Sequence, residues 1–241
     1  MKKNFTWAII PARSGSKSIK NKNIFRINGH PLIAYSIMVA KKSNTIDKII
    51  VTSDSKNYLD IAKKYGADIL HLRSKKNSSD KATDFDVFQE FVNYAQLNLE
   101  QELPDCLALL RPTTPTRESK IIDKAISLFN SKFKKNSGMR SVSKMSESSF
   151  KTLEINRGYL ATIFNRSTNI ENANKPKEFF RETYAANGYI DIIKTENIIK
   201  KKMMFGKKVL PFIIKGPVAD IDDKNDLKYA EYLLSTKYLK I

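Results

Sequence analysis

The sequence predicts an α/β fold in which helices cover both faces of a mostly parallel sheet. Short apolar runs typical of buried strands alternate with longer stretches whose apolar residues recur at helical spacing. The first of these runs passes directly into a polar, basic loop, as expected where ligands bind outside the carboxyl ends of parallel strands. At 241 residues, 41% of them hydrophobic, the chain has the size and apolar content of one such domain.

Strand and helix patterns alternate regularly through the first half of the chain. We expect strands at 5–10, 48–52, 69–72 and 106–110, and helices at 31–42, 58–65, 84–99 and 120–129. Pro31 favours a helix start, because its missing N–H needs no partner in the first turn, and Gly66 favours a helix end. The second strand runs into a Ser-Asp-Ser cluster, and we expect Asp54 to cap the helix that follows. The run at 106–110 is the candidate central strand.

This alternation breaks between Met145 and Ala185, after a strand expected at 138–143. The segment contains two alternating patches, at 150–153 and 159–164, followed by a polar, Asn-rich stretch. The pattern indicates a protruding hairpin and arm rather than another strand–helix unit. Further strands are expected after Asn187-Gly188 and within 208–215, and a final helix at 227–234.

The loop after the first strand gathers cations and small residues. Within Ala8–Ile24 the apolar run ends at Pro11, and Arg13, Lys17 and Lys22 then alternate with Ser and Gly. Small residues let backbone N–H groups approach phosphate oxygens, and Arg and Lys neutralise the charge. Neither GxxxxGK[ST] nor GxGxxG is present, and a basic surface turn would look similar on these residues alone.

Another pattern with chemical meaning lies near the end of the chain. The Asp-Ile-Asp spacing places Asp220 and Asp222 on one side of an extended chain, where both are available to one hard cation. Mg²⁺ prefers one or two carboxylates together with substrate phosphates and waters. The alternative is that Asp222 or Asp223 caps the final helix.

Taken in order, four motifs between Ala8 and about Leu234 resemble the acylneuraminate cytidylyltransferases. They are the basic loop with Ile27-Asn-Gly-His-Pro-Leu-Ile33 after it, the turn Arg111-Pro-Thr-Thr-Pro-Thr-Arg117, Tyr184-Ala-Ala-Asn187-Gly-Tyr-Ile190, and Asp220-Ile-Asp222. The resemblance implies a Rossmann-like sheet with an inserted dimerisation arm. It also implies transfer of CMP from CTP to the anomeric hydroxyl of an acidic nine-carbon 2-keto sugar (a nonulosonate), with release of pyrophosphate.

The resemblance implies roles for individual residues. Arg13, Lys22 and Asp220 are the expected catalytic residues, and Asp220 and Asp222 the expected Mg²⁺ ligands. The expected nucleotide-binding residues are Ala12, Arg13, Ser14, Ser16, Lys17, Lys22, Asn23, Arg73 and Asp80. The expected sugar-binding residues are Arg111, Thr113, Lys151, Tyr184 and Asn187.

The chain also departs from the family pattern. Arg111 replaces a Gln that the sialic-acid enzymes place at the sugar, so the resemblance favours a relative of sialic acid as acceptor. The Arg-Gln that usually precedes the Tyr-x-x-Asn-Gly element is absent, and Lys177 and Arg181 are the nearest cations. The resemblance also implies the domain organisation. We expect residues 1–241 to form a single nucleotidyltransferase domain, with 145–185 as an arm that forms a homodimer and completes the sugar site.

Two alternatives remain open from the sequence. The first is the CMP-Kdo synthetase branch, which uses an eight-carbon acid, although Ile19-Lys-Asn-Lys-Asn23 favours the nine-carbon branch over the usual Arg-Leu-Pro-Gly-Lys of the rival. The second is a non-catalytic nucleic-acid-binding protein, suggested by the net charge of +18. Because the lysines are spread along the whole chain, we do not expect nucleic acid as a partner.

Bulk features also restrict the compartment that we expect. No apolar run approaches the length of a membrane span. The only cysteine is Cys106, which excludes a disulfide framework within one chain. We expect a cytoplasmic protein without membrane contacts.

Overall fold

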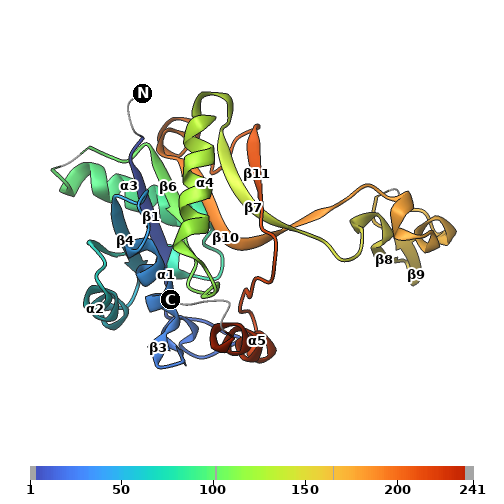
Figure 1. Ribbon diagram of the computed structural model, residues 1–241, viewed down its shortest axis with the longest axis horizontal. Helices are drawn as coiled ribbons and strands as arrows, with labels where there is room; N and C mark the ends of the chain where they lie inside the picture. The colour runs from blue at the N-terminus through green and yellow to red at the C-terminus, as the bar shows by residue number, and fades with distance from the viewer. Residues whose placement is uncertain (1–3, 101, 165, 237–241) are drawn as a thin grey trace.

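The computed structural model describes residues 4–100, 102–164 and 166–236, and it shows a central sheet between two layers of helices (Figure 1). The sheet has seven strands in the order β11-β7-β10-β6-β1-β4-β5. Neighbouring strands are parallel except at β10, which runs antiparallel to both β6 and β7. The predicted mostly parallel α/β fold is therefore confirmed, and the run at 106–110 does form the central strand.

The elements follow the predicted ranges closely outside the arm. The sheet consists of β1 (Thr6–Pro11), β4 (Lys48–Ser53), β5 (Ile69–Leu72), β6 (Cys106–Leu109), β7 (Gly138–Lys144), β10 (Tyr184–Lys194) and β11 (Val209–Ile213). The helices are α1 (Leu32–Lys41), α2 (Lys56–Tyr65), α3 (Asp84–Asn98), α4 (Ser119–Ser131) and α5 (Lys224–Ser235). Two small hairpins pair β2 (Arg26–Ile27) with β3 (His30–Pro31), and β8 (Leu153–Asn156) with β9 (Tyr159–Thr162).

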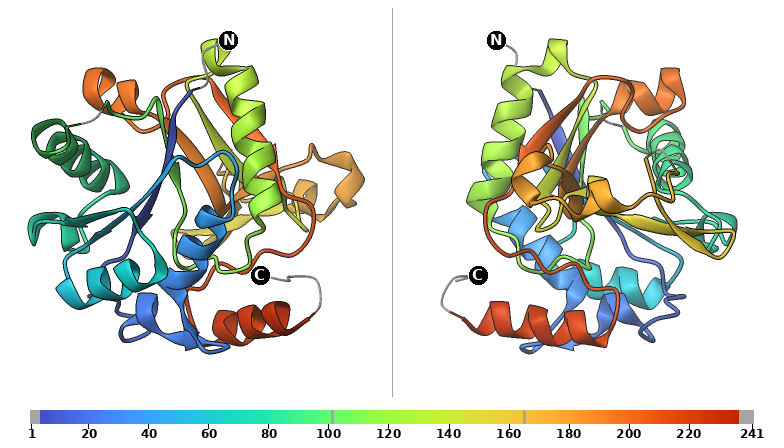
Figure 2. Two further views of the ribbon diagram at one scale, coloured as in Figure 1. Left: turned by 60° about the vertical axis from the view of Figure 1, so that its left-hand side comes forward. Right: turned by 90° about the vertical axis from the view of Figure 1, so that its right-hand side faces the viewer.

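Side chains of the central strands fill a core on each face of the sheet. Ala8 and Ile10 of β1 belong to the cluster that includes α1, α2 and α4. Trp7 and Ile9 belong to the opposite cluster, with α3 and the π-helical turn Asn197–Lys201. Burial on both faces explains why these strands are almost continuously apolar in sequence. Figure 2 shows the helices on either side of the sheet and α5 beside α1 at one end.

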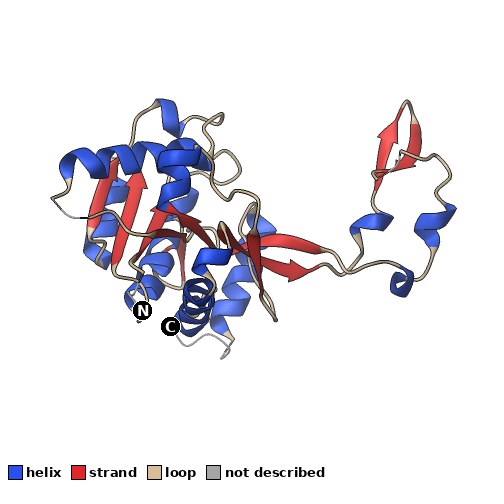
Figure 3. Cartoon of the chain, turned by 90° about the horizontal axis from the view of Figure 1, so that it is seen from above, coloured by secondary structure: helices blue, strands red, loops and turns tan. Residues whose placement is uncertain are grey.

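An arm projects from the sheet between β7 and β10, as Figures 1 and 3 show. It leaves after β7, carries the β8–β9 hairpin and returns at the start of β10. The expected hairpin is present, but the patch at 150–153 is mostly a 3₁₀ turn (Ser149–Lys151), and the first hairpin strand begins at Leu153. None of the helices among the described residues is long and apolar enough to cross a membrane.

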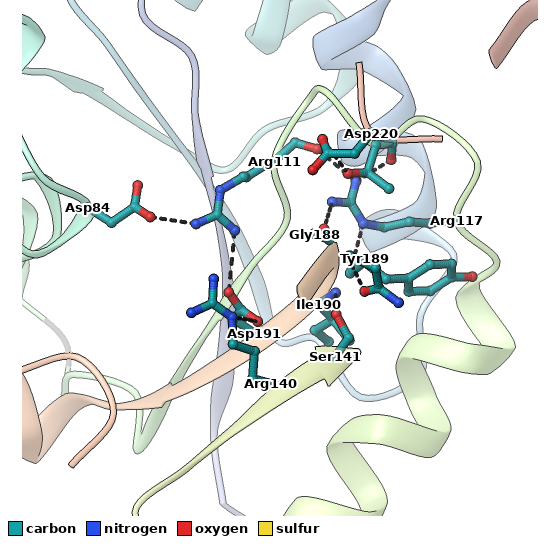
Figure 4. Close-up of polar contacts among 12 residues, drawn as sticks. Asp84, Arg111, Arg117, Arg140, Ser141, Gly188, Tyr189, Ile190, Asp191 and Asp220 are labelled. Atoms are coloured by element: carbon teal, nitrogen blue, oxygen red, sulfur yellow. Dashed lines mark hydrogen bonds and ion pairs between the residues drawn. The ribbon is translucent and has the colours of Figure 1, made fainter. Parts of the chain in front are cut away.

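A buried arginine fixes the turn that follows β6 (Figure 4). Arg117 is 3% exposed, and its guanidinium donates to the carbonyls of Arg111 (2.8 Å), Thr114 (2.6 Å) and Gly188 (2.7 Å). It also donates to Tyr189 O and to Ser36 Oγ, so that it joins this turn to β10 and α1. Burial lowers the pKa of Arg117 to about 9, and the side chain therefore stays charged at neutral pH.

Close packing at this turn explains a glycine in β10. The register of β10 against β7 shifts between Ala186 and Asp191, which marks a bulge. Within the bulge Gly188 has φ of 66°, and a Cβ there would lie 2.9 Å from both Asp220 Oδ2 and Thr114 Oγ1. A side chain at this position would therefore displace the groups that surround the turn.

We predict that Arg117→Met destabilises the protein by about 3–5 kcal/mol, because several buried carbonyl groups lose a charged donor together. Urea unfolding measures the change. Arg26→Met is the matched control, since Arg26 is exposed and donates to Gly29 O in its own hairpin (2.7 Å). The control should change stability by less than about 1 kcal/mol. Equal losses in the two variants would contradict the role given to Arg117.

Candidate active site

A cleft of about 510 Å³ opens where the carboxyl ends of β1, β5 and β6 meet. Its walls come from the loops after these strands, the start of α3 and the segment before α5. Parallel strands bring their carboxyl ends to one edge of a sheet, so loops far apart in sequence converge there. Five cationic side chains and three carboxylates line the cleft: Arg13, Lys17, Lys22, Arg73 and Arg111, with Asp80, Asp84 and Asp222.

The basic loop after β1 supplies one wall of the cleft. Arg13, Ser16, Lys17, Lys22 and Asn23 line it, as expected for these nucleotide-binding candidates. Asn23 is 7% exposed and donates to Arg13 O (2.9 Å), which closes the loop on itself. The Lys22 side chain is 12% exposed, and its Nζ donates to Ile221 O (2.8 Å). Lys22 therefore ties the basic loop to the Asp220-Ile-Asp222 segment.

Two of the predicted nucleotide-binding residues do not line the cleft themselves. Ala12 is buried, and its N–H donates to Thr52 O (2.9 Å). Ser14 instead contacts Asp54, to which its N–H (2.8 Å) and its hydroxyl (2.7 Å) both donate. The predicted helix-capping role of Asp54 is wrong, because Ser55 caps α2 by accepting from Tyr58 N (3.4 Å).

The loop after β5 forms the facing wall. Arg73 is 6% exposed, and within the described residues its Nε and Nη2 atoms have no hydrogen-bond partner. Asp80 accepts from Arg13 Nη1 (2.7 Å) and from Lys17 Nζ (2.5 Å). These hydrogen bonds, first that of Lys17 and then that of Arg13, lower the pKa of Asp80. Asp80 is thus paired with two of the cations that we expect to bind phosphate, Arg13 and Lys17. A triphosphate would compete with Asp80 for these two side chains.

Arg111, which departs from the sequence pattern that the chain resembles, is already paired. Arg111 lies at the end of β6, with Nη2 2.5 Å from Asp84 Oδ2 and Nη1 3.3 Å from Asp191 Oδ2 (Figure 4). Arg140 Nε lies 3.7 Å from the other oxygen of Asp191. Burial raises the pKa of Asp191, although both arginines act against it. Arg111 and Thr113, two of the predicted sugar-binding residues, line the cleft, and Arg111 does so as part of a charge network.

The predicted metal ligands lie beside this turn. Asp220 and Asp222 are exposed while Ile221 between them is buried, and Ile221 N donates to Thr113 O (2.8 Å). The cap of α5 is Asp223, which accepts from Asn225 N (2.7 Å) and Asp226 N (3.0 Å). Because Asp223 takes the capping role, Asp222 is not the cap, and it lines the cleft instead.

The chemistry of this pair fits a metal that shares its ligands with a substrate. No cluster of three or more His, Cys, Asp or Glu side chains that could hold a metal ion occurs among residues 4–100, 102–164 and 166–236. Asp222 lines the cleft, whereas Asp220 does not and accepts from Thr114 Oγ1 (3.3 Å). One or two exposed carboxylates suit Mg²⁺, which usually takes its remaining ligands from phosphates and water.

Three of the predicted sugar-binding residues lie outside the cleft of their own chain. Lys151 belongs to the arm, and its Nζ lies 3.5 Å from Glu147 Oε2. Tyr184, at the base of the arm, donates to Glu182 Oε2 (2.8 Å). Asn187 is 8% exposed, donates to Ser143 Oγ (2.9 Å) and accepts from Tyr189 N (3.1 Å), so it shapes the β10 bulge.

Solved structures of nucleotidyltransferases share the fold. A CMP:2-keto-3-deoxy-manno-octonic acid synthetase complexed with CTP superposes with a TM-score of 0.66 over 97% of this chain and 99% of its own, at 13% identity. A 4-diphosphocytidyl-2C-methyl-D-erythritol synthase from Anaerococcus prevotii gives a TM-score of 0.63 over 96% of both chains, at 14% identity. Residues 7–217 match the cytidylyltransferase family, and the chain belongs to it.

Sequence relatives narrow the family further. The chain is 36% identical to an N-acylneuraminate cytidylyltransferase of Escherichia coli over 92% of its own length and 50% of that protein, so it spans only half of this relative. It is 30% identical to post-translational flagellin modification protein B of Campylobacter coli, over 96% of this chain and 95% of that protein. It is also 28% identical to a CMP-N,N'-diacetyllegionaminic acid synthase of Legionella pneumophila, over 92% of both.

We predict that Lys22→Ala lowers kcat/KM for CTP by at least about tenfold, because it removes a charge-assisted contact from the cleft. Steady-state kinetics with varied CTP measure the effect. Lys20→Ala is the matched control, since Lys20 is an exposed cation of the same loop that does not line the cleft. Full kcat/KM in the Lys22 variant would refute the proposed phosphate loop.

Proposed function

We propose that the chain transfers CMP from CTP to an acidic nine-carbon 2-keto sugar and releases pyrophosphate. One observation carries the proposal: the basic loop after β1 and the Asp220-Ile-Asp222 segment meet at the cleft, through the bond from Lys22 Nζ to Ile221 O (2.8 Å). Cations for a triphosphate therefore lie together with the carboxylate of Asp222, which a hard metal ion could use. Such an arrangement would neutralise the negative charge of the triphosphate and of the leaving pyrophosphate.

The acceptor class is supported by the sequence relatives. They are named for neuraminic, legionaminic and pseudaminic acids. The eight-carbon-acid synthetase is similar at 13% identity, which shows the fold alone. The nine-carbon acceptor is therefore favoured over the CMP-Kdo alternative. The use of CTP and the single buried, free Cys106 are consistent with a cytoplasmic enzyme.

In the proposed reaction the anomeric oxygen of the acceptor attacks the α-phosphorus of CTP in line with the bond to the β-phosphate. A new bond forms between the anomeric oxygen and the α-phosphorus. The bond from the α-phosphorus to the oxygen that bridges to the β-phosphate breaks, and the hydroxyl proton is released with pyrophosphate. Positioning and charge neutralisation account for most of such catalysis. Arg13, Lys17 and Lys22 would hold the phosphates, and Asn23 keeps their loop closed through Arg13 O.

We assign a Mg²⁺ site to Asp220 and Asp222. When bound, Mg²⁺ supplies a positive charge that screens the triphosphate and polarises an oxygen ligand. The protein's contribution is to expose both carboxylates in the segment before α5, where Ile221 between them is buried and is fixed by the bond from its N–H to Thr113 O.

We predict that Asp222→Asn removes most activity and raises the Mg²⁺ concentration needed for the remainder, because an amide keeps the shape but deletes the charge. Activity titrated with Mg²⁺ measures this, together with the melting temperature. Asp223→Asn is the matched control, because Asp223 is the cap of α5 and Asn caps about as well as Asp. Normal activity of Asp222→Asn at low Mg²⁺ would refute the metal role.

We propose that residues 145–185 form a dimerisation arm within a single-domain enzyme. The arm exposes large apolar side chains, including Ile155 (79%), Tyr159 (71%) and Phe164 (58%). A lone two-stranded hairpin is marginally stable in water and needs a packing partner. A hollow of about 450 Å³ at the base of the arm is lined by three cations, Lys144, Lys177 and Arg181, and by Glu178 and Glu182. Glu182 pairs with Lys144, so Lys177 and Arg181 are the cations that an acidic sugar could use. In the proposed dimer the partner's arm completes the sugar site and supplies Lys151.

Light scattering at micromolar concentration should give about twice the chain mass of 27.6 kDa. Ile155→Asp combined with Phe164→Asp should produce monomers, because charges would be buried at the interface. Leu97→Asp is the control, since Leu97 is 85% exposed on α3. A wild-type mass near 27.6 kDa would refute the dimer.

We predict that legionaminic or pseudaminic acid is a better acceptor than N-acetylneuraminic acid, because Arg111, held by Asp84 and Asp191, places a planar cation at the cleft where the family pattern has Gln. Pyrophosphate release, with CTP and each acid side by side, measures the preference, and Kdo tests the eight-carbon alternative. If N-acetylneuraminic acid is the best acceptor, the role of Arg111 is wrong. If no nine-carbon acid supports turnover, the proposed function is wrong.

A further inference from the structure

Asp54 lies between two parts of the cleft that belong to different loops. It follows β4, the neighbour of β1 in the sheet, and does not line the cleft itself. We propose that Asp54 is a positioning residue for the nucleotide, which holds the basic loop through Ser14 and balances the charge of Arg73. This inference rests on the proposed function, because it assigns a role in CTP binding.

The contacts of Ser14 give the first part of the argument. Its N–H and hydroxyl both donate to Asp54, at 2.8 and 2.7 Å, and the two bonds use separate oxygens of the carboxylate. Ser14 follows Arg13, which lines the cleft. The next residue is Gly15, where an added Cβ would meet no other atom within 4 Å. The loop has no regular secondary structure at 12–16, so these bonds anchor it at its centre. Hydrogen bonds to a charged acceptor are the stronger kind.

The environment of Arg73 gives the second part. Its guanidinium is buried at the cleft wall, and Nε and Nη2 have no hydrogen-bond partner among the described residues. The N–H of Arg73 donates to Ser53 O (2.9 Å), the residue before Asp54, so the two charged residues follow neighbouring strands at the same edge of the sheet. The negative charge of Asp54 favours the charged form of Arg73, while Arg13 opposes it. A buried charge without compensation is strongly unfavourable. Asp54 therefore allows Arg73 to remain charged while keeping N–H groups available to a ligand.

Asp54 is itself in the ionised form that this role requires. Burial alone would raise its pKa, but the hydrogen bonds from Ser14 and the charge of Arg73 outweigh burial and lower the pKa. The role does not depend on pH in the neutral range, where the carboxylate stays charged.

Asp54→Ala tests the proposal, with Asp68→Ala as the matched control. Asp68 accepts a backbone N–H, that of Ile49 (2.7 Å), near the opposite end of the same strand, β4. We expect Asp54→Ala to raise KM for CTP at least about tenfold while KM for the sugar changes by less than about twofold. Amide hydrogen exchange at 13–18 should become faster in this variant. The control should change neither quantity, even if both variants lose stability.

Asp54→Asn separates the two parts of the proposal. The amide can accept from Ser14 N and donate to Ser14 Oγ, so exchange at 13–18 should stay slow, while KM for CTP still rises because the charge beside Arg73 is lost. An unchanged KM in Asp54→Ala, or an equal rise in the Asp68 control, would overturn the proposal. If the wild type does not use CTP, the proposed function fails, and the exchange rates alone then decide whether Asp54 holds the loop.

Discussion

The buried guanidinium of Arg117 connects the parts of the protein on which the cleft depends. It donates to carbonyls of the turn after β6 and of the β10 bulge, and to a hydroxyl of α1. The same turn carries Arg111 into the cleft and binds Ile221 N through Thr113 O. Segments more than 70 residues apart in sequence are therefore held by one charged group (Figure 4). Its burial is tolerated because carbonyl and hydroxyl oxygens surround it.

In this structure most cations of the cleft are already engaged. Asp80 binds Arg13 and Lys17, Asp84 binds Arg111, and Ile221 O accepts from Lys22. A triphosphate would therefore replace internal contacts rather than meet bare charges, and its net affinity is the difference between the two sets. Arg73 is the exception within the described residues, because its guanidinium keeps N–H groups without partners. The cleft thus contains four cations whose internal contacts a ligand would have to replace, and one, Arg73, with N–H groups that a ligand could bind directly.

Sequence patterns predicted most of the fold because strands buried on both faces and amphipathic helices leave strong local signals. The basic loop and the alternation around Asp220 and Asp222 were also readable, since both depend on neighbours in sequence. The partners of Arg111 were not, because Asp84 and Asp191 are 27 and 80 residues away and meet it only through the strand order. Asp54 was misassigned for the same reason: a Ser-Asp-Ser cluster contains two possible caps, and only the structure shows that Ser55 is the cap. The roles of Lys151, Tyr184 and Asn187 remain predictions that depend on a second chain.

The central claim is that the cleft between the basic loop and the loop after β5 is the CTP site. A crystal structure with a non-hydrolysable CTP analogue tests it most directly. We expect the phosphates to contact Arg13, Lys17 and Lys22, with Asp80 released from the first two, and Arg73 to bond the nucleotide. A nucleotide bound elsewhere on the lysine-rich surface, with the Asp80 contacts intact, would contradict the account.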